Sequence, residues 1–155
     1  MKLQTILAPI DFSDVSSRVV DHAESMAKGF GGRVVLLHIA EPEPDFVGFE
    51  PGPPAVRAST ALDFRGEHRH LEEYKQRLTA AGVEVLALHI QGPLAEKVLE
   101  EADRQAADLI VMGSHGHGAL YNLLVGSVTS GVLKNARCPV LIVPALPASP
   151  AGAPQ

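Results

Sequence analysis

The sequence predicts an α/β domain built on an open, doubly wound parallel sheet of five strands in the order 3-2-1-4-5, with helices on both faces, as in Rossmann-like and flavodoxin-like folds. Short apolar runs of strand length recur along the chain, and several are apolar on both faces, which is typical of buried parallel strands. Helical patterns separate these runs, so strand and helix alternate. A length of 155 residues with 46% hydrophobic content suits one domain with one core.

The predicted strands are rich in branched apolar residues and cover residues 5–8, 34–39, 83–90, 109–112 and 140–143. Apolar residues at steps of three and four from Val15 to Phe30 predict a first amphipathic helix, with Ser13 as its N-cap and glycines within 29–32 at its end. We therefore expect this helix to cross over between the first two strands.

Three further helices follow from the same kind of pattern. One carries apolar residues from Leu71 to Ala81 before Gly82, a second starts at Pro93, and a third opens at Gly126. Residues 41–54 contain five prolines and two glycines and predict a mobile loop. Residues 145–155 are rich in Ala and Pro and predict a disordered tail. The domain is therefore expected to cover residues 1–144, and the glycine motif within it predicts that it binds a nucleotide.

Charge and cysteine content exclude several classes of function. Lys and Arg number 13 against 18 Asp and Glu, so the formal charge of −5 provides no electrostatic footprint for nucleic acid or anionic lipid. No apolar stretch reaches the roughly 18 residues of a membrane span. The single cysteine, Cys138, cannot form an internal disulfide. We therefore expect a cytoplasmic protein with neither a nucleic-acid nor a membrane partner.

Candidate binding residues gather where strands 1 and 4 would end, because a crevice opens at that point of a doubly wound sheet. The first strand is followed by Pro9, Ile10 and Asp11, and the fourth by the glycine-rich segment 113–118 and then by 126–129. Glycine lets the backbone approach a ligand closely, and a helix N-terminus favours an anion by about 0.3 to 1 kcal/mol. With the hydroxyls of Ser127 and Thr129 nearby, the segment predicts a phosphate site.

The spacing G-x2-G-x9-G-S is formed by Gly113, Gly116, Gly126 and Ser127, and it resembles the motif of the ATP-binding branch of the universal stress protein family. Segments 6–13, 37–39, 107–113 and 138–144 also resemble that family. Its fold is similar to that of the adenine nucleotide alpha hydrolases. The departures are Ala8 and Ile10, where Thr is frequent in the family, and the long proline-rich segment 41–54.

The resemblance implies ATP as ligand, with Mg²⁺, and a role for each residue that matches the family pattern. Those implied to surround the adenine are Pro9, Ile10, Asp11 and Ile39. Met112 and Gly113 are implied to lie near the ribose. Those implied to meet the phosphates are Gly116, Gly126, Ser127, Val128 and Thr129.

Other readings of the sequence are less favoured. The P-loop pattern G-x4-G-K-[S/T] is absent, as is G-x-G-x-x-G after the first strand. The run 115–118 superficially resembles the histidine signature of nucleotidyltransferases, which however follows strand 1 rather than strand 4. The histidine pairs His68/His70 and His115/His117 have no Cys or carboxylate at zinc-site spacing, so no metal site is expected. His38 and His89 are expected to be hydrogen-bonded structural histidines.

A catalytic role is not expected, because no Lys or Arg occurs between Arg104 and Lys134 to support phosphoryl transfer. The sequence thus favours a nucleotide-responsive stress or signalling protein with at most slow ATP hydrolysis and no catalytic residue. The alternative is a non-catalytic interaction module of the same fold, with an empty pocket or another nucleotide such as a cyclic one. Strand 5 would lie at the sheet edge, so we expect a homodimer through Val140, Leu141, Ile142 and Val143.

Overall fold

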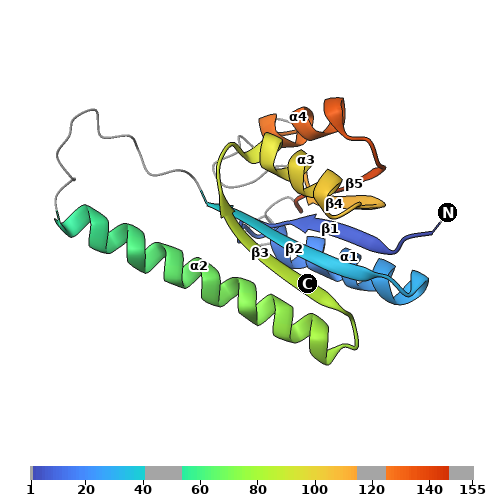
Figure 1. The fold of residues 1–155 in the computed structure, drawn as a ribbon, viewed down its shortest axis with the longest axis horizontal. Coiled ribbons are helices and arrows are strands. Elements are labelled where there is room, and N and C mark those ends of the chain that lie inside the picture. The colour runs from blue at the N-terminus through green and yellow to red at the C-terminus, as the bar shows by residue number, and fades with distance from the viewer. Residues whose placement is uncertain (1, 41–53, 115–124, 147–155) are drawn as a thin grey trace, which may run out of the picture.

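The computed structural model describes residues 2–40, 54–114 and 125–146 and contains a five-stranded parallel sheet in the order β3-β2-β1-β4-β5 (Figure 1). The strands are β1 (Thr5–Pro9), β2 (Arg33–Ala40), β3 (Val85–Gln91), β4 (Leu109–Gly113) and β5 (Val140–Val143). The helices are α1 (Ser16–Phe30), α2 (Pro54–Ala80), α3 (Leu94–Arg104) and α4 (Ser127–Asn135). The predicted fold class and strand order are confirmed.

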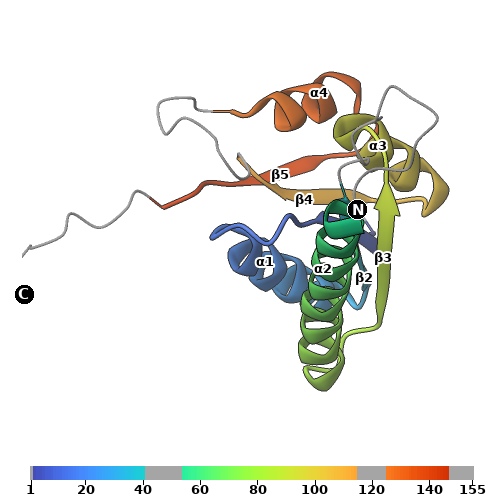
Figure 2. The same ribbon diagram turned by 90° about the vertical axis from the view of Figure 1, so that its left-hand side faces the viewer.

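Helices α1 and α2 cover one face of the sheet, and α3 and α4 cover the other (Figures 1 and 2). The alternation of side chains along a strand divides the core in the same way. Ile6 and Ala8 pack on the side of α1 and α2, whereas Leu7 packs on the side of α3 and α4. All three are fully buried, which explains why the strand sequences are apolar at consecutive positions.

The first helix begins later than predicted and ends as predicted. It starts at Ser16 with no side-chain cap, so the prediction of Ser13 as N-cap is wrong. The physical reason is that the Ser13 hydroxyl donates to Asp11 Oδ1 at 2.6 Å instead of bonding to the helix. At the other end, Gly31 adopts the left-handed conformation (φ 69°), and its N–H donates to the carbonyl of Ala27.

The second helix is longer than its apolar pattern predicted. It begins at Pro54, where proline suits a first helical position, so this residue belongs to α2 and not to the preceding loop. Strand β3 begins at Val85 rather than at residue 83, because the N–H of Val83 donates to the carbonyl of Leu78 and closes the end of α2.

Two predicted irregular segments fall largely beyond what the structure describes. Residues 41–53 of the predicted loop and 147–155 of the predicted tail lie outside the described residues. Ala145 and Leu146 belong to neither a helix nor a strand. Among the helices of the described ranges, none is both long enough and apolar enough to cross a membrane.

Candidate functional site

The strand arrangement from which a crevice is predicted is present at β1 and β4. These strands are parallel neighbours, with Ile6 opposite Leu109 and Leu7 opposite Ile110. The helices that follow them, α1 and α4, lie on opposite faces of the sheet (Figures 1 and 2). The carboxyl ends of β1 and β4 are therefore a topological switch point, the place where open α/β sheets bind their ligands.

The loop after β1 is held in one conformation by hydrogen bonds. The N–H of Ile10 donates to the carbonyl of Leu37 at 2.9 Å, which ties the loop to β2. Asp11 Oδ1 accepts from the N–H of Ser13 at 3.0 Å and from the hydroxyl of Ser16 at 3.2 Å, as well as from the Ser13 hydroxyl. The Asp11 carboxylate is thus oriented by the first residues of the path into α1, and a ligand would meet it already positioned.

The segment after β4 is tied both to β5 and to the start of α4. The N–H of Ser114 donates to the carbonyl of Val143 at 2.9 Å, and the N–H of Gly126 donates to the carbonyl of Ser114 at 2.8 Å. The hydroxyl of Thr129 donates to the carbonyl of Gly113 at 3.0 Å. These bonds fix the N-terminus of α4 directly beyond the end of β4.

The N-terminus of α4 presents main-chain donors without a competing side chain. Gly126 is the N-cap with φ −72° and ψ 166°, it makes no side-chain cap, and no acidic residue stands in the first turn. The first N–H that bonds back within the helix is that of Ser130, to the carbonyl of Gly126 at 2.9 Å. Helix geometry leaves the N–H groups of Ser127, Val128 and Thr129 without intrahelical acceptors. This arrangement suits a phosphate or another anion.

The sequence-predicted site residues that the structure describes lie at this one edge of the sheet. Ile39 and Met112, at the ends of β2 and β4, are 8% and 5% exposed. Ser127 is exposed, whereas Thr129 is buried and its hydroxyl is committed to Gly113, so only its N–H is left for a ligand. Gly116 lies outside the described residues. The contacts of these residues with a nucleotide remain predictions.

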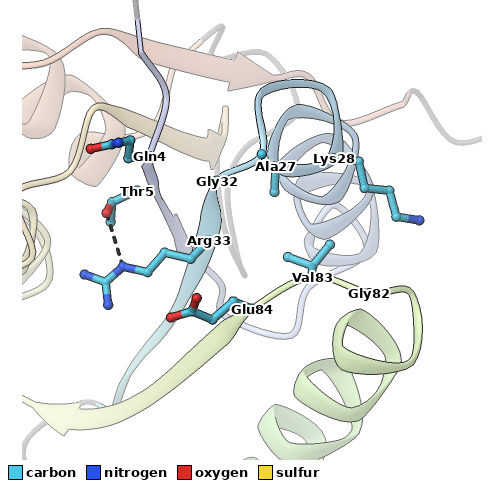
Figure 3. Close-up of a pocket in the computed structure, with 10 residues that line it drawn as sticks. Gln4, Thr5, Ala27, Lys28, Gly32, Arg33, Gly82, Val83 and Glu84 are labelled. Carbon is cyan, nitrogen blue, oxygen red and sulfur yellow. Dashed lines mark hydrogen bonds between the residues drawn. The ribbon is translucent and has the colours of Figure 1, made fainter.

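A depression of about 650 Å³ lies at the opposite end of the sheet, around the amino ends of β1, β2 and β3 (Figure 3). Two of its polar side chains are engaged with each other, since Arg33 Nε donates to the hydroxyl of Thr5 at 3.2 Å. Glu84 lines the same depression beside Arg33 in the close-up. Because ligands of open α/β sheets bind at the carboxyl ends of the strands, we place the candidate site at the opposite edge.

Sequence reasoning missed a second group of ionisable side chains, which the structure brings together at the carboxyl edge. His38 and His89 are register partners on β2 and β3, and one carboxylate oxygen of Glu67 on α2 lies near both rings. Glu67 Oε2 is 3.2 Å from His38 Nε2 and 3.4 Å from His89 Nε2. Burial, and then the nearby His38, lower the pKa of His89, against an opposing effect of Glu67. A signal was present, because each histidine continues an apolar alternation, after Val34 and Leu36 in one strand and Val85 and Ala87 in the other.

Comparison with known proteins relates the chain to one family. Residues 2–144 match the model of the universal stress protein family. The chain is 36% identical over 138 residues to universal stress protein MJ0531 of Methanocaldococcus jannaschii, covering 89% of this chain and 80% of that protein. The universal stress protein UspA from Lactobacillus plantarum shares the fold with a TM-score of 0.72, at 22% identity over 92% of this chain and 99% of that one. A universal stress protein in complex with cAMP is similar with a TM-score of 0.66 and 26% identity, over 92% of this chain and 98% of that one.

Proposed function

This chain belongs to the universal stress protein family, and we propose that it binds an adenine nucleotide, ATP with Mg²⁺, at the carboxyl ends of β1 and β4 and acts as a nucleotide-responsive stress or signalling protein. The observation that carries the proposal is the N-terminus of α4. Its first three N–H groups have no intrahelical acceptor, and the hydrogen bond from Gly126 to Ser114 places them beyond the end of β4, where the order of the strands predicts a ligand crevice. An anionic group is the ligand that such donors favour.

The remaining parts of the site complement a nucleoside. Ile10, Ile39 and Met112 are apolar residues at the strand ends and provide surfaces for a base or a sugar, while the oriented Asp11 carboxylate can accept hydrogen bonds from either. The universal stress protein with cAMP bound supports an adenine nucleotide as the class of ligand. ATP is favoured over shorter nucleotides by the glycine spacing, in which Gly113 would lie near the ribose and Gly116 and Gly126 would line a polyphosphate.

Equilibrium titration of the protein with ATP, with and without Mg²⁺, tests the proposal. The decisive variant is Gly126→Val, because Gly126 has φ −72°, a backbone conformation that valine adopts without strain. A loss of binding would therefore reflect side-chain bulk at the phosphate site rather than a misfolded turn. The matched control is Gly29→Val, since an added Cβ at Gly29 meets no neighbouring atom.

We expect Gly126→Val to weaken ATP binding by at least about tenfold, which corresponds to about 1.4 kcal/mol, and Gly29→Val to leave it unchanged. A smaller loss, of a few fold, is expected for Ser127→Ala, with the exposed Ser17 of α1 as the serine control. Equal ATP affinity in wild type and Gly126→Val would refute the phosphate site.

Catalytic turnover is proposed to be absent or slow. In this sequence no Lys or Arg stands between Arg104 and Lys134, so the phosphate site relies on main-chain amides, hydroxyls and Mg²⁺. Such a site binds a triphosphate but lacks the cation that stabilises a transferring phosphoryl group. Purified protein that hydrolyses ATP at several turnovers per second would contradict this part of the proposal.

A second candidate is a cyclic nucleotide as the physiological ligand, which the solved complex with cAMP favours. Titration with cAMP, AMP and ATP under identical conditions separates the two. Tighter binding of cAMP than of ATP would assign the site to the cyclic nucleotide, whose single phosphate needs fewer of the donors at α4. No binding of any of the three would favour an interaction module of the same fold.

We also propose a homodimer through the edge strand and a cytoplasmic location. Strand β5 is at the edge of the sheet, and Val140, Leu141 and Ile142 are only partly buried there. A second copy could cover them about a two-fold axis. Sedimentation of a monomer at micromolar concentration would rule the dimer out. The cytoplasmic location rests on the single cysteine, and fractionation of cells tests it.

A further inference from the structure

Two strands and one helix bring His38, His89 and Glu67 together on the face of the sheet that α2 covers. Side chains alternate along a strand, so His38 of β2 shares the α1 and α2 face with Val34 and Leu36, which belong to the core on that side. His89 of β3 lies directly beside His38 in the parallel register. The views in Figures 1 and 2 place α2 along these two strands.

Glu67 is held against the histidines by the buried side of α2. It precedes Leu71 by one helical turn, and Leu71 and Leu78 are fully buried against the sheet. The Glu67 side chain is 35% exposed, whereas those of His38 and His89 are 6% exposed. A carboxylate at the edge of the core therefore faces two imidazole rings inside it.

The spacing of the three groups matches that of ligands on one metal ion. Glu67 Oε2 is 3.2 Å from His38 Nε2 and 3.4 Å from His89 Nε2, and one ligand atom from each residue lies within 4.8 Å of the others. On a tetrahedral zinc ion with bonds of about 2.0 Å, ligand atoms are roughly 3.3 Å apart. Small rotations of the side chains therefore suffice to surround an ion.

The protonation state of His38 strengthens this reading. Its Nδ1 is 2.9 Å from the carbonyl of Ile10, and a carbonyl only accepts, so Nδ1 carries a hydrogen. In the neutral ring the lone pair is then on Nε2, which is buried, has no hydrogen-bond partner among the described residues, and points at the carboxylate of Glu67. Two acceptors 3.2 Å apart need a positive charge between them. A histidine whose second nitrogen donates to a carbonyl is also the usual arrangement of a metal ligand.

We propose that His38, His89 and Glu67 form a binding site for a divalent transition-metal ion, with Zn²⁺ the best match. Two imidazoles and one carboxylate suit Zn²⁺, whereas Mg²⁺ and Ca²⁺ prefer oxygen ligands. Three protein ligands leave a fourth position for water or another donor. The bound ion joins β2, β3 and α2. The proposal does not depend on nucleotide binding, because none of its three ligands belongs to the proposed nucleotide site.

The test is titration of chelator-treated protein with Zn²⁺ by calorimetry, with Mg²⁺ in excess to occupy oxygen-only sites. Two conservative variants remove one ligand each, Glu67→Gln and His89→Gln. The matched controls are Glu73→Gln, an exposed carboxylate on the same helix, and His22→Gln, a histidine of α1. All titrations use the double variant His115→Gln/His117→Gln as background, so that these two histidines contribute no zinc binding.

We expect one Zn²⁺ per chain at this site, with the affinity lowered by at least 10- to 100-fold in Glu67→Gln and His89→Gln and unchanged in both controls. Substitution by Co²⁺ gives visible absorption of a tetrahedral or five-coordinate ion, and that absorption is expected to disappear with either ligand variant. Ring nitrogen signals of His38 and His89 in nuclear magnetic resonance spectra are expected to shift on zinc addition, which tests the site even where a variant folds poorly.

Unchanged zinc affinity in Glu67→Gln, or histidine ring signals that move with pH but not with Zn²⁺, would overturn the proposal. The second result would mean that a proton alone bridges the carboxylate and the imidazole. Failure of ATP binding by the wild-type protein, whose His115 and His117 are unchanged, bears only on the nucleotide proposal, so the two can fail separately.

Discussion

The ends of β1 and β4 and the ends of β2 and β3 lie along the same edge of the sheet but present different chemical groups. At β1 and β4 the groups available to a ligand are main-chain N–H donors and the hydroxyl of Ser127, with Gly126 as the N-cap of α4. At β2 and β3 they are two imidazoles and a carboxylate. The first set favours an anion and the second a cation.

The difference shows how one topology supports two kinds of site. A helix whose N-terminus lies beside the end of a strand, as that of α4 does, presents N–H groups that have no intrahelical acceptor, and the side chains there can be small. A helix that instead runs over the strand ends, as α2 does, brings its own side chains against the side chains of the strands. His38 joins the two regions, since it donates to the carbonyl of Ile10 in the loop after β1.

The largest expected effect is the rise in Tm that each ligand causes, ATP at the ends of β1 and β4 and Zn²⁺ at the ends of β2 and β3. Each ligand at about a hundred times its dissociation constant stabilises the native state by about 2.7 kcal/mol, a rise in Tm of roughly 5 to 10 °C for a chain of this length. Glu67→Gln is expected to lose the rise with Zn²⁺ and keep the rise with ATP, while Gly126→Val does the opposite. Differential scanning fluorimetry measures both. Loss of both responses in one variant would show that the two regions form a single site.

A smaller effect tests the hydrogen bond that fixes α4 to β4. Thr129→Val removes the donor to the carbonyl of Gly113, within a side chain that is 2% exposed, and is expected to lower the free energy of unfolding by about 1 to 2 kcal/mol. Affinity for ATP is expected to fall with it, while affinity for Zn²⁺ is unchanged. Thr79→Val is the control, because the Thr79 hydroxyl makes a bond to the carbonyl of Lys75 on an exposed part of α2. Urea unfolding with equal stability of the two variants would contradict the assigned role of Thr129.

The smallest expected effect is on the titration of Tyr74, one of the two tyrosines of the chain, the other being Tyr121. Burial raises the pKa of Tyr74, which lies on α2 near Phe12, and the neighbouring Arg77 opposes the rise. Because the native state then keeps the proton to higher pH than the unfolded state, this tyrosine lowers stability as pH rises above about 10. In Tyr121→Phe, where Tyr74 is the remaining tyrosine, phenolate absorbance is expected at higher pH in folded than in urea-unfolded protein. Coincident titrations would show that Tyr74 is not shielded by the core.

The strand positions and the placing of α4 were predictable because they depend on local pattern. Apolar runs identified all five strands to within two residues, and Gly126 followed by Ser127 marked the start of α4. Two local signals misled. The Ser13 hydroxyl bonds to Asp11 rather than capping α1, and α2 extends to Pro54, well beyond the apolar residues that predicted it. Apolar periodicity reveals neither feature: it does not show which partner a hydroxyl selects, and the apolar pattern that predicts α2 begins only at Leu71.

The sequence by itself determined the doubly wound sheet, because buried parallel strands must be apolar on both faces and crossover connections must be right-handed. It also determined the glycine spacing from which the nucleotide site is proposed, since those residues belong to one continuous segment, 113–127. Only the tertiary structure decided the meeting of His38, His89 and Glu67, which are separated by 20 residues or more and come from three elements. Their contact depends on the register of β2 with β3 and on the path of α2 across both strands, and neither is encoded in any short segment.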